Sequence, residues 1–309
     1  RISPDEPWRI VRTRWRVASK VRGPVEGGGR VSGYFTAATG VTSYRGDAFG
    51  ESFRGNAFVA DAGSNLVHRK LLKYADGVVP KGERPKEERS SEFLASTDNW
   101  FRPVQLGNGP DGCLYILDMY REVIEHPWSL PQGIKKHLDL NSGNDRGRIW
   151  RVLPKDFKRP RNPRLGDATT RQLVDNLSSP NAWIRETSSR LLFERRDVRA
   201  VSLLGQKLAK DSSHLGRLQA IHALASLGKL KAAQILTAFA DDHPVVREHA
   251  IRLAEPFLKQ KHPEEMAGAL LALSKDSSAP VRFQLALSLG ILKVQGEVEA
   301  LLELLGRHP

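Results

Sequence analysis

Residues 97–127 read TDNWFRPVQLGNGPDGCLYILDMYREVIEHP, and two short apolar runs stand out in them. These runs, at 104–106 and 113–117, flank the turn Gly109-Pro110-Asp111-Gly112. Proline fixes φ near the value that the second turn position needs, and glycine readily adopts the left-handed conformation that tight turns use. The pattern therefore predicts a β-hairpin.

Polar and aromatic side chains crowd both ends of this predicted hairpin. They are Asp98, Asn99, Trp100 and Arg102 before the first strand, and Asp118, Tyr120 and Arg121 after the second. A strand pair does not need such side chains for its own stability, whereas loops on a rigid sheet often carry function. The cluster therefore predicts a binding surface at this end of the sheet.

The composition excludes several classes of function. The 309 residues carry 48 Lys and Arg against 35 Asp and Glu. This excess is spread over both halves of the chain, which argues against a nucleic-acid-binding stripe. Cys113 is the only cysteine, so an internal disulfide, a cysteine-rich zinc site and a Cys-x-x-Cys-His haem motif are excluded.

Histidine spacing predicts no metal site, because no pair has the i, i+4 spacing of helical ligands. The sequence has no apolar run long enough to span a membrane and no signal peptide. It begins with Arg1, and we expect the chain to be an internal piece of a longer protein.

Short apolar segments between Gly, Pro, Asn and Asp predict strands. We expect them at 32–37, 41–44, 56–60, 66–73, 93–95, 102–106, 113–118 and 148–153. Residues 11–17 alternate between apolar and basic, which predicts a further strand with one solvated face. Residues 78–92 are predicted to form a solvated loop. So many short strands indicate an all-β sandwich, barrel or propeller.

An internal repeat favours the propeller. Residues 55–61 and 112–118 share one pattern, which is Gly, an apolar strand and then Asp. The separation between the copies is near the repeat length of a propeller blade with a loop insertion. Two blades cannot close a ring, so the remaining blades are expected upstream. We predict that residues 1–153 are about the last two blades of a β-propeller.

The C-terminal part has a different period. After a Pro- and Arg-rich linker at 154–166, apolar residues recur with the period of a helix. Helical pairs are predicted at 169–178 with 181–194, 197–210 with 214–227, 229–241 with 244–259 and 263–275 with 279–293, followed by a helix at 297–306. A matching arginine recurs at Arg185, Arg217, Arg247 and Arg282. This predicts an α-solenoid of HEAT-like repeats over 167–309 and a β + α multidomain chain.

Arg102 is the main candidate for cofactor binding. It leads into a strand whose start would face the propeller channel, and its guanidinium fork suits a carboxylate or a quinone oxygen. Asn99 and Asp98 would orient it. Further candidate channel-end residues are Asp118, Tyr120, Arg121, His126, Asp61 and His68.

A structural alternative stays open for this cluster. In it, Asp98, Arg102, Asp118 and Arg121 tie loops together by salt bridges. Three aromatic residues, Trp100, Phe101 and Trp128, are predicted to lie in the core.

Seven motifs resemble one bacterial family. They are SGYFT at 32–36, YRGD at 44–47, NLVHR at 65–69, DNWFRP at 98–103, DMYRE at 118–122, EHPW at 125–128 and DRGRI at 145–149. These motifs resemble the PVC-type membrane-bound dehydrogenases. The likeness runs from about residue 8 to 153, and HEAT repeats follow in that family too.

The resemblance implies a propeller similar to that of the quinoprotein glucose/sorbosone dehydrogenases. It implies pyrroloquinoline quinone (PQQ) and calcium as cofactors and a sugar or alcohol as substrate. Haem c would be carried only on a cytochrome c domain that this chain lacks. The location would be periplasmic or at the cell envelope, and membrane association would come only through missing segments.

The residue-by-residue match to this family is partial. Arg102 matches a basic residue that contacts the quinone, whereas Trp100 and Gly63 stand where the family has an arginine and a lysine. The catalytic histidine belongs to an earlier blade. We therefore expect this fragment of a sugar or alcohol dehydrogenase to be inactive by itself. The alternative is a non-enzymatic propeller and HEAT module that binds a polysaccharide or, through the solenoid, a partner protein.

Overall fold

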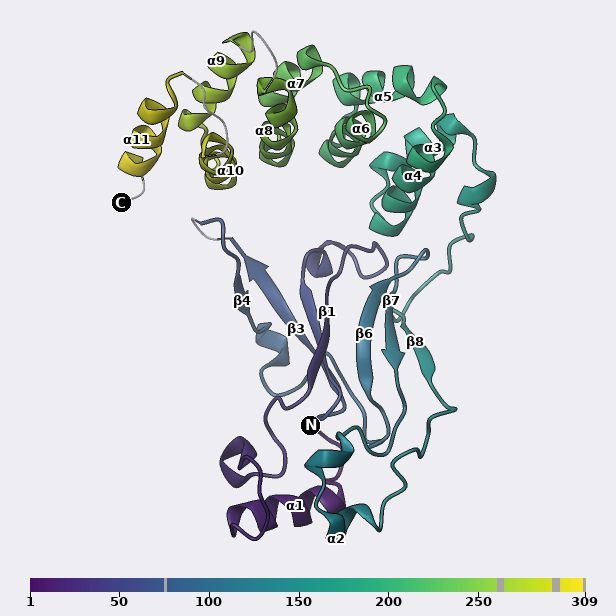
Figure 1. The fold of residues 1–309 in the computed structure, drawn as a ribbon. Coiled ribbons are helices and arrows are strands. Elements are labelled where there is room, and N and C mark those ends of the chain that lie inside the picture. Colours follow the sequence, from purple (N-terminus) through teal and green to yellow (C-terminus); the bar gives the residue numbers. More distant parts are fainter. Residues whose placement is uncertain (75–76, 260–263, 291–294, 308–309) are drawn as a thin grey trace. The chain divides into compact units, whose positions relative to one another are not determined.

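The chain divides into two compact units (Figure 1). The computed structural model describes residues 1–74, 77–259, 264–290 and 295–307. The sheet unit comprises Arg1–Lys73 and Lys81–Pro160, and the solenoid unit comprises Tyr74–Pro80 and Arg161–Pro309. Within the described residues, no helix combines the length and the apolar character that crossing a bilayer requires.

The described residues of the sheet unit form two antiparallel sheets. The first has the order β1 (Ala38–Ser43), β2 (Ala57–Asp61), β3 (Leu66–Lys73) and β4 (Lys81–Glu83), and β5 (Leu94–Ala95) also pairs with β3. The second has the order β6 (Pro103–Asn108), β7 (Leu114–Asp118) and β8 (Arg148–Val152). The predicted β6–β7 hairpin is confirmed, and Gly112 takes φ 78° in its turn.

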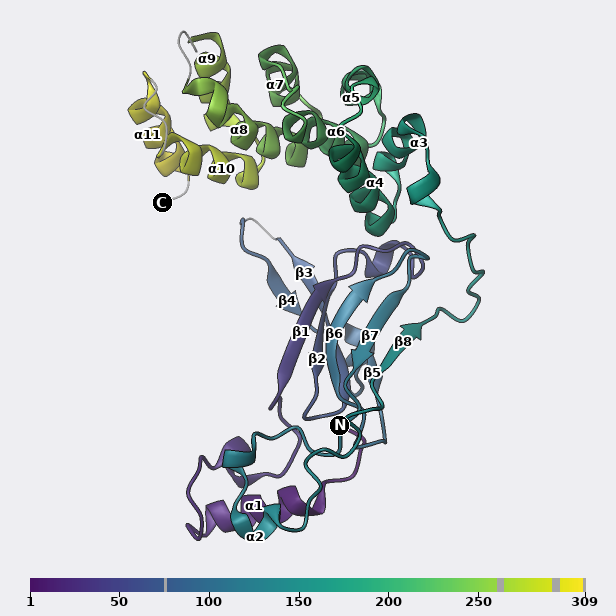
Figure 2. The same cartoon turned by 45° about the vertical axis from the view of Figure 1, so that its right-hand side comes forward.

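The core of the sheet unit lies between the two sheets. The first sheet contributes Phe58, Ala60 and Val67, the second contributes Leu106, Leu114 and Ile116, and Tyr44, the residue after β1, packs with them. Strands β1 and β6 lie side by side in both views (Figures 1 and 2). Hydroxyls of β1 join them, because Thr39 Oγ1 donates to the carbonyl of Pro103 at 3.0 Å and Thr42 Oγ1 donates to that of Leu106 at 2.9 Å.

The strand predicted at 11–17 is wrong, because these residues belong to helix α1 (Pro7–Val17). Trp8, Arg9, Arg12 and Arg16 are buried on one side of this helix, and this spacing is helical. The alternation of apolar and basic residues had suggested a period of two. The helix buries arginines as well as Trp8, so the side that faces the protein is not the apolar one.

Helix α1 packs on the segment that follows β7. Trp8 clusters there with Val123, Leu130 and Ile134. Ile134 belongs to the short helix α2 (Gln132–Lys135). The cluster thus holds part of the segment between β7 and β8 against α1.

Two further local predictions are wrong. Residues 32–37 form no strand, because the backbone N–H groups of Thr36 and Ala37 donate to the carboxylate of Asp61 instead of to a neighbouring strand. The loop predicted at 78–92 contains β4, and Glu88 in it is buried beside Arg69. The many charged residues of this segment had suggested a solvated loop, so its packing beside Arg69 was not predicted.

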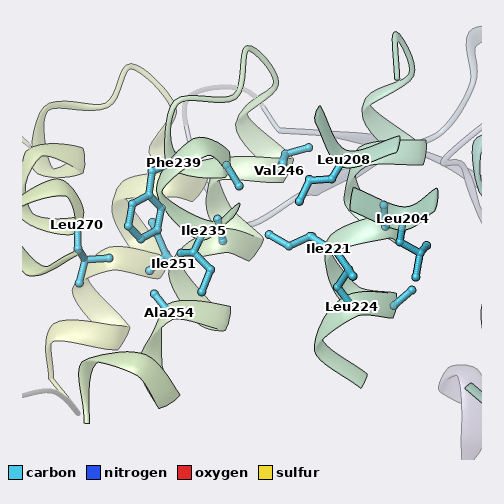
Figure 3. Close-up of a cluster of buried hydrophobic side chains, with 14 of the residues drawn as sticks. Leu204, Leu208, Ile221, Leu224, Ile235, Phe239, Val246, Ile251, Ala254 and Leu270 are labelled. Carbon is cyan, nitrogen blue, oxygen red and sulfur yellow. The ribbon is translucent and has the colours of Figure 1, made fainter. Parts of the chain in front are cut away.

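The solenoid unit consists of helices of about the predicted lengths. They are α3 (Thr170–Asp175), α4 (Ala182–Arg195), α5 (Arg199–Lys210), α6 (His214–Ser226), α7 (Ala232–Phe239), α8 (Pro244–Leu258), α9 (Glu264–Ala272), α10 (Ala279–Leu289) and α11 (Glu297–Arg307). Their apolar faces share one continuous core, part of which Figure 3 shows. The ends predicted at 260–263 and 291–293 lie outside the described residues. The predicted β + α organisation is confirmed.

The recurring arginines of the solenoid join successive repeats. Arg217 of α6 binds both carboxylate oxygens of Asp241 at 2.6 and 2.7 Å. Arg247 of α8 binds both oxygens of Asp276 at 2.7 and 2.9 Å. Each of these aspartates also accepts the backbone N–H two residues later, so it caps the turn before the next helix.

Candidate functional site

The predicted channel-end residue Asp61 lies buried at the end of β2, where it organises two loops. Its carboxylate accepts the backbone N–H groups of Thr36 and Ala37, which precede β1, at 3.2 and 3.1 Å. It also accepts those of Gly63 and Ser64, in the turn that follows β2, at 3.0 and 3.3 Å. The carboxylate therefore holds the start of β1 against the end of β2.

Asp118 joins two loops in the same way at the end of β7. Its Oδ1 accepts the backbone N–H of Arg102, before β6, at 2.8 Å and that of Tyr120, after β7, at 2.9 Å. Its Oδ2 accepts the indole N–H of Trp150 on β8 at 2.9 Å. Asp61 pairs with the first residue of β1, and Asp118 pairs with the first residue of β6. The repeat found in the sequence is therefore a repeat of structure.

The predicted cofactor residue Arg102 is completely buried. Its guanidinium lies 3.0 Å from the carboxylate of Glu6, at the start of α1. It also donates to three backbone carbonyls, those of Ala62 at 3.1 Å, Arg121 at 2.9 Å and Glu122 at 2.6 Å. Arg102 thus joins α1, the turn after β2 and the segment after β7.

The Arg102–Glu6 pair lies among other charges. Burial lowers the pKa of the Arg102 guanidinium, and the negative charge of Glu6 opposes that effect. Burial alone would raise the pKa of the Glu6 carboxyl, but Arg9, Arg102 and Arg1 outweigh it and hold that pKa below its usual value. The carboxylate is therefore charged and shared among several arginines.

These contacts do not fit a quinone held by Arg102. A guanidinium has five N–H donors, and here four of them already point at Glu6 and the three carbonyls. The side chain has no exposed surface through which a ligand could reach it. The geometry agrees with the salt-bridge alternative, with a partner that sequence reasoning missed, because Glu6 lies far away in the chain.

Asp98 and Asn99, the predicted supports of Arg102, have other contacts. Asp98 is exposed, and its Oδ1 accepts the backbone N–H of Trp100 at 2.9 Å within its own turn. Asn99 Oδ1 lies 3.4 Å from Nη2 of Arg1. Arg1 also bonds to Glu6 at 2.8 Å, so the side chain of Asn99 is linked to the guanidinium of Arg102 indirectly, through Arg1 and Glu6.

A small cavity adjoins the Asp61 end of the sheet. Its volume is about 190 Å³, and Arg1, Tyr34, Phe35, Asp61, Ser64, Arg84 and Glu92 are among its lining residues. Among the predicted site residues, Asp61 reaches this cavity, while His68 lies close behind Phe35, with ring centroids 5.4 Å apart. The cavity offers both donors and acceptors beside two aromatic rings.

His68 is held by a carboxylate. Its Nδ1 lies 2.6 Å from Oε2 of Glu92, and the other oxygen of Glu92 accepts from Arg84 at 2.6 Å. Burial raises the pKa of Glu92, but His68 and Arg84 together lower it below its usual value. Arg84 and Glu92 come from the segment predicted to be a solvated loop, and the charge pattern of that loop gave no sign of this pairing.

The other candidate channel-end residues stay near β7 but do not converge. Tyr120 has a backbone φ of 49°. The guanidinium carbon of Arg148 lies 3.4 Å from the centroid of the Tyr120 ring. Arg121 donates to the carbonyl of Leu140 at 2.6 Å. His126 is exposed, and its Nδ1 accepts the backbone N–H of Trp128 at 3.2 Å. These contacts fix the path of the chain between β7 and β8.

Of the three aromatic residues predicted to lie in the core, one is buried, one is partly buried and one is exposed. Phe101 is buried in the core, whereas Trp100 is partly buried against Tyr120. The prediction for Trp128 is wrong, because its side chain is 92% exposed. Across the described residues, no group of three or more His, Cys, Asp and Glu side chains is arranged to hold a metal ion.

Comparison with known families separates the same two regions. Residues 4–156 match a family model described as a domain of unknown function (DUF7133). Residues 170–255 match the model for HEAT repeats. A search of curated proteins finds no match. The helical region that follows the sheet unit therefore carries HEAT repeats.

Proposed function

We propose that the sheet unit is a run of two adjoining blades of a β-propeller, within a protein that resembles the quinoprotein sugar and alcohol dehydrogenases. The observation that carries the proposal is that the two sheets are equivalent and stack head to tail. In such stacking, the face that is covered in the first sheet is exposed in the second, where another blade could pack. Repeated around an axis, it generates a ring when the rotation closes.

The equivalence follows from strand register. Asp61 on β2 pairs with Leu66 on β3, and Asp118 on β7 pairs with Arg148 on β8. Strands β1, β2 and β3 thus correspond to β6, β7 and β8. The first pair of strands in each sheet also has an irregularity next to the residue that pairs with the aspartate.

The matched faces differ in what covers them. Ala60 and Val67 of the first sheet lie in the core against the second sheet. Their counterparts in the second sheet are Leu117, which is 38% exposed, and Ile149, which is 70% exposed. An apolar face that is covered in one copy and open in the next is the arrangement expected when a further blade is missing.

In this proposal, substrate and cofactor would bind at the end of the propeller where the strands carry Asp61 and Asp118. The resemblance assigns a sugar or alcohol substrate, and electrons would pass to a cytochrome c domain outside this chain at the cell envelope. PQQ would supply hydride acceptance when bound. Arg102 would hold the frame of the propeller instead of touching that cofactor.

The second candidate is a non-enzymatic module that binds a polysaccharide or a partner protein. Two observations favour it. Four of the five N–H donors of Arg102 are engaged by Glu6 and by backbone carbonyls. In addition, a side chain at Gly63, where the family has a lysine, would place Cβ 2.4 Å from Cγ2 of Thr36. This structure thus has no room for a cofactor-contacting lysine at that position.

The stacking can be tested with Ile149→Lys in this chain and in a longer protein that carries the flanking blades. In this chain we expect a change in unfolding free energy within about 0.5 kcal/mol, since the site is exposed. In the longer protein the charge would be buried, and we expect a loss of about 2 kcal/mol or more. Val198→Lys, at a 74% exposed position of the solenoid unit, is the control. An equally small effect in both proteins would rule out a covering blade.

The two candidate functions are separated by titrating the longer protein with PQQ and calcium. A change in the quinone spectrum together with dye reduction by a sugar or alcohol supports the dehydrogenase. An unchanged spectrum, with no dye reduction by any of these substrates, removes it and leaves the binding module. Neither result depends on the outcome of the Ile149→Lys comparison.

A further inference from the structure

Two pairs of histidines lie between helices α6 and α8 of the solenoid unit. His222 of α6 meets His249 of α8 with ring centroids 4.9 Å apart. His214, the first residue of α6, stacks on His243, the residue before α8, with centroids 3.7 Å apart and planes within 4° of parallel. One helix interface therefore contains four imidazoles in two direct contacts.

The first pair requires at least one neutral ring. Nε2 of His222 lies 2.9 Å from Nδ1 of His249, so one nitrogen donates and the other must accept without a proton. Burial, reinforced by His249 and Arg252, lowers the pKa of His222 to about 4. Burial also lowers the pKa of His249; Glu248 opposes this effect and Arg252 adds to it. Two charged rings at this distance would repel each other.

The second pair is linked to the start of α8. Nδ1 of His243 accepts the backbone N–H of Val245 at 3.3 Å and so caps the helix. Protonation at that nitrogen would turn the acceptor into a donor that faces another donor. It would also put a positive charge against the parallel ring of His214.

The charges around the stacked rings do not favour protonation. Burial lowers the pKa of both His214 and His243. Arginines add to the effect, with Arg217 near both rings, Arg185 near His214 and Arg247 near His243. Asp241 is the opposing charge, and Arg217 already binds both of its oxygens.

We propose that the α6–α8 interface is an acid-sensitive joint, which is closed while the four rings are mostly neutral and loosens when the pairs are protonated. The sign follows from linkage. Rings that are harder to protonate in the closed state than in the open state contribute full stability above about pH 6.5, and this contribution is lost as the pH falls. Acid would thus loosen the contact between successive HEAT repeats without cutting the chain.

The test is amide hydrogen exchange of α6 and α8 at about pH 7.5 and about pH 5, corrected for intrinsic exchange. A pKa of about 4 when closed and about 6.5 when open makes His222 alone raise the opening equilibrium about 30-fold at the lower pH. We expect His222→Gln/His249→Gln, which keeps polar contacts but cannot become charged, to lose most of this increase. His126→Gln, at an exposed site of the sheet unit, is the control and should respond like the unmodified chain.

A second measurement keeps the proposal testable if the double variant folds poorly. The proton resonances of the histidine rings in the unmodified chain give each pKa directly. A midpoint for His222 well below about 6.5 supports the proposal. A midpoint near 6.5 for His222, or equal acid responses of the double variant and the unmodified chain, would overturn it.

Discussion

The two units use arginine contacts in opposite ways. In the sheet unit, Arg102 is a single hub that joins Glu6 to loops far apart in the sequence. In the solenoid unit, Arg217 and Arg247 each bind an aspartate of the next repeat. Arg102 brings these loops together at one point, whereas the arginine–aspartate contact of the solenoid unit recurs. We infer that the same kind of substitution damages the whole of one unit but only one joint of the other.

The largest effect is expected for Arg102→Met. The change leaves Glu6 buried without one of its partners and removes the donors to three carbonyls. Breaking a buried pair of this kind costs about 3–5 kcal/mol. Five of the six tryptophans lie in the sheet unit, so urea unfolding followed by tryptophan fluorescence reports mainly on that unit.

Arg121→Met is the matched control for the hub. Arg121 is only partly buried, and its side chain donates to the carbonyl of Leu140. We expect a loss of about 1 kcal/mol, the usual worth of one such hydrogen bond. Similar losses for both variants would mean that Arg102 is not a hub.

The sequence predicted best those features that depend on neighbouring residues. The hairpin followed from the Gly109 to Gly112 turn and the apolar runs beside it. The repeats of the solenoid followed from the spacing of Arg217 and Arg247, because each repeat contacts its neighbours at fixed offsets. The failure at 11–17 has a physical reason, since a helix that buries arginines does not follow the binary pattern of apolar and polar residues.

The site was harder to predict because its contacts are long-range. The Asp61 and Asp118 repeat was visible in the sequence, and both residues do occupy equivalent strand ends. Glu6 was missed as the partner of Arg102, since 96 positions separate them and no spacing rule connects them. Glu92 was missed as the partner of His68 because it lies in a segment whose composition resembles a solvated loop.

A smaller and local effect is expected for Arg247→Met. It removes the two bonds to Asp276 and those to the carbonyls of Asp241 and Asp242. Bonds to charged groups are worth about 1.5–3 kcal/mol, and partial exposure favours the lower value. Hydrogen exchange should rise in α8 and α10 and stay unchanged in β2, β3 and β7.

Arg190→Met is the control for the arginine–aspartate contacts between repeats. Its ion pair with Glu194 lies on the surface at 3.6 Å, with both side chains more than half exposed, and should contribute little. If Arg247→Met instead increased exchange through every helix of the solenoid unit, the contacts between repeats would not be independent. The contrast between the Arg102 hub and the separate arginine–aspartate contacts of the solenoid unit would then fail.

The smallest effect is expected for Trp128→Ser, although tryptophan usually contributes much to a core. Its side chain is 92% exposed, and the contact that fixes this turn is the backbone N–H of residue 128 donating to His126, which serine retains. The unfolding free energy, measured by the helical circular dichroism signal and by fluorescence, should change by less than about 0.5 kcal/mol. A loss of 2 kcal/mol or more would mean that Trp128 packs against another part of the protein. Loops joined to the Arg102 hub would then be stabilised from outside as well as from within.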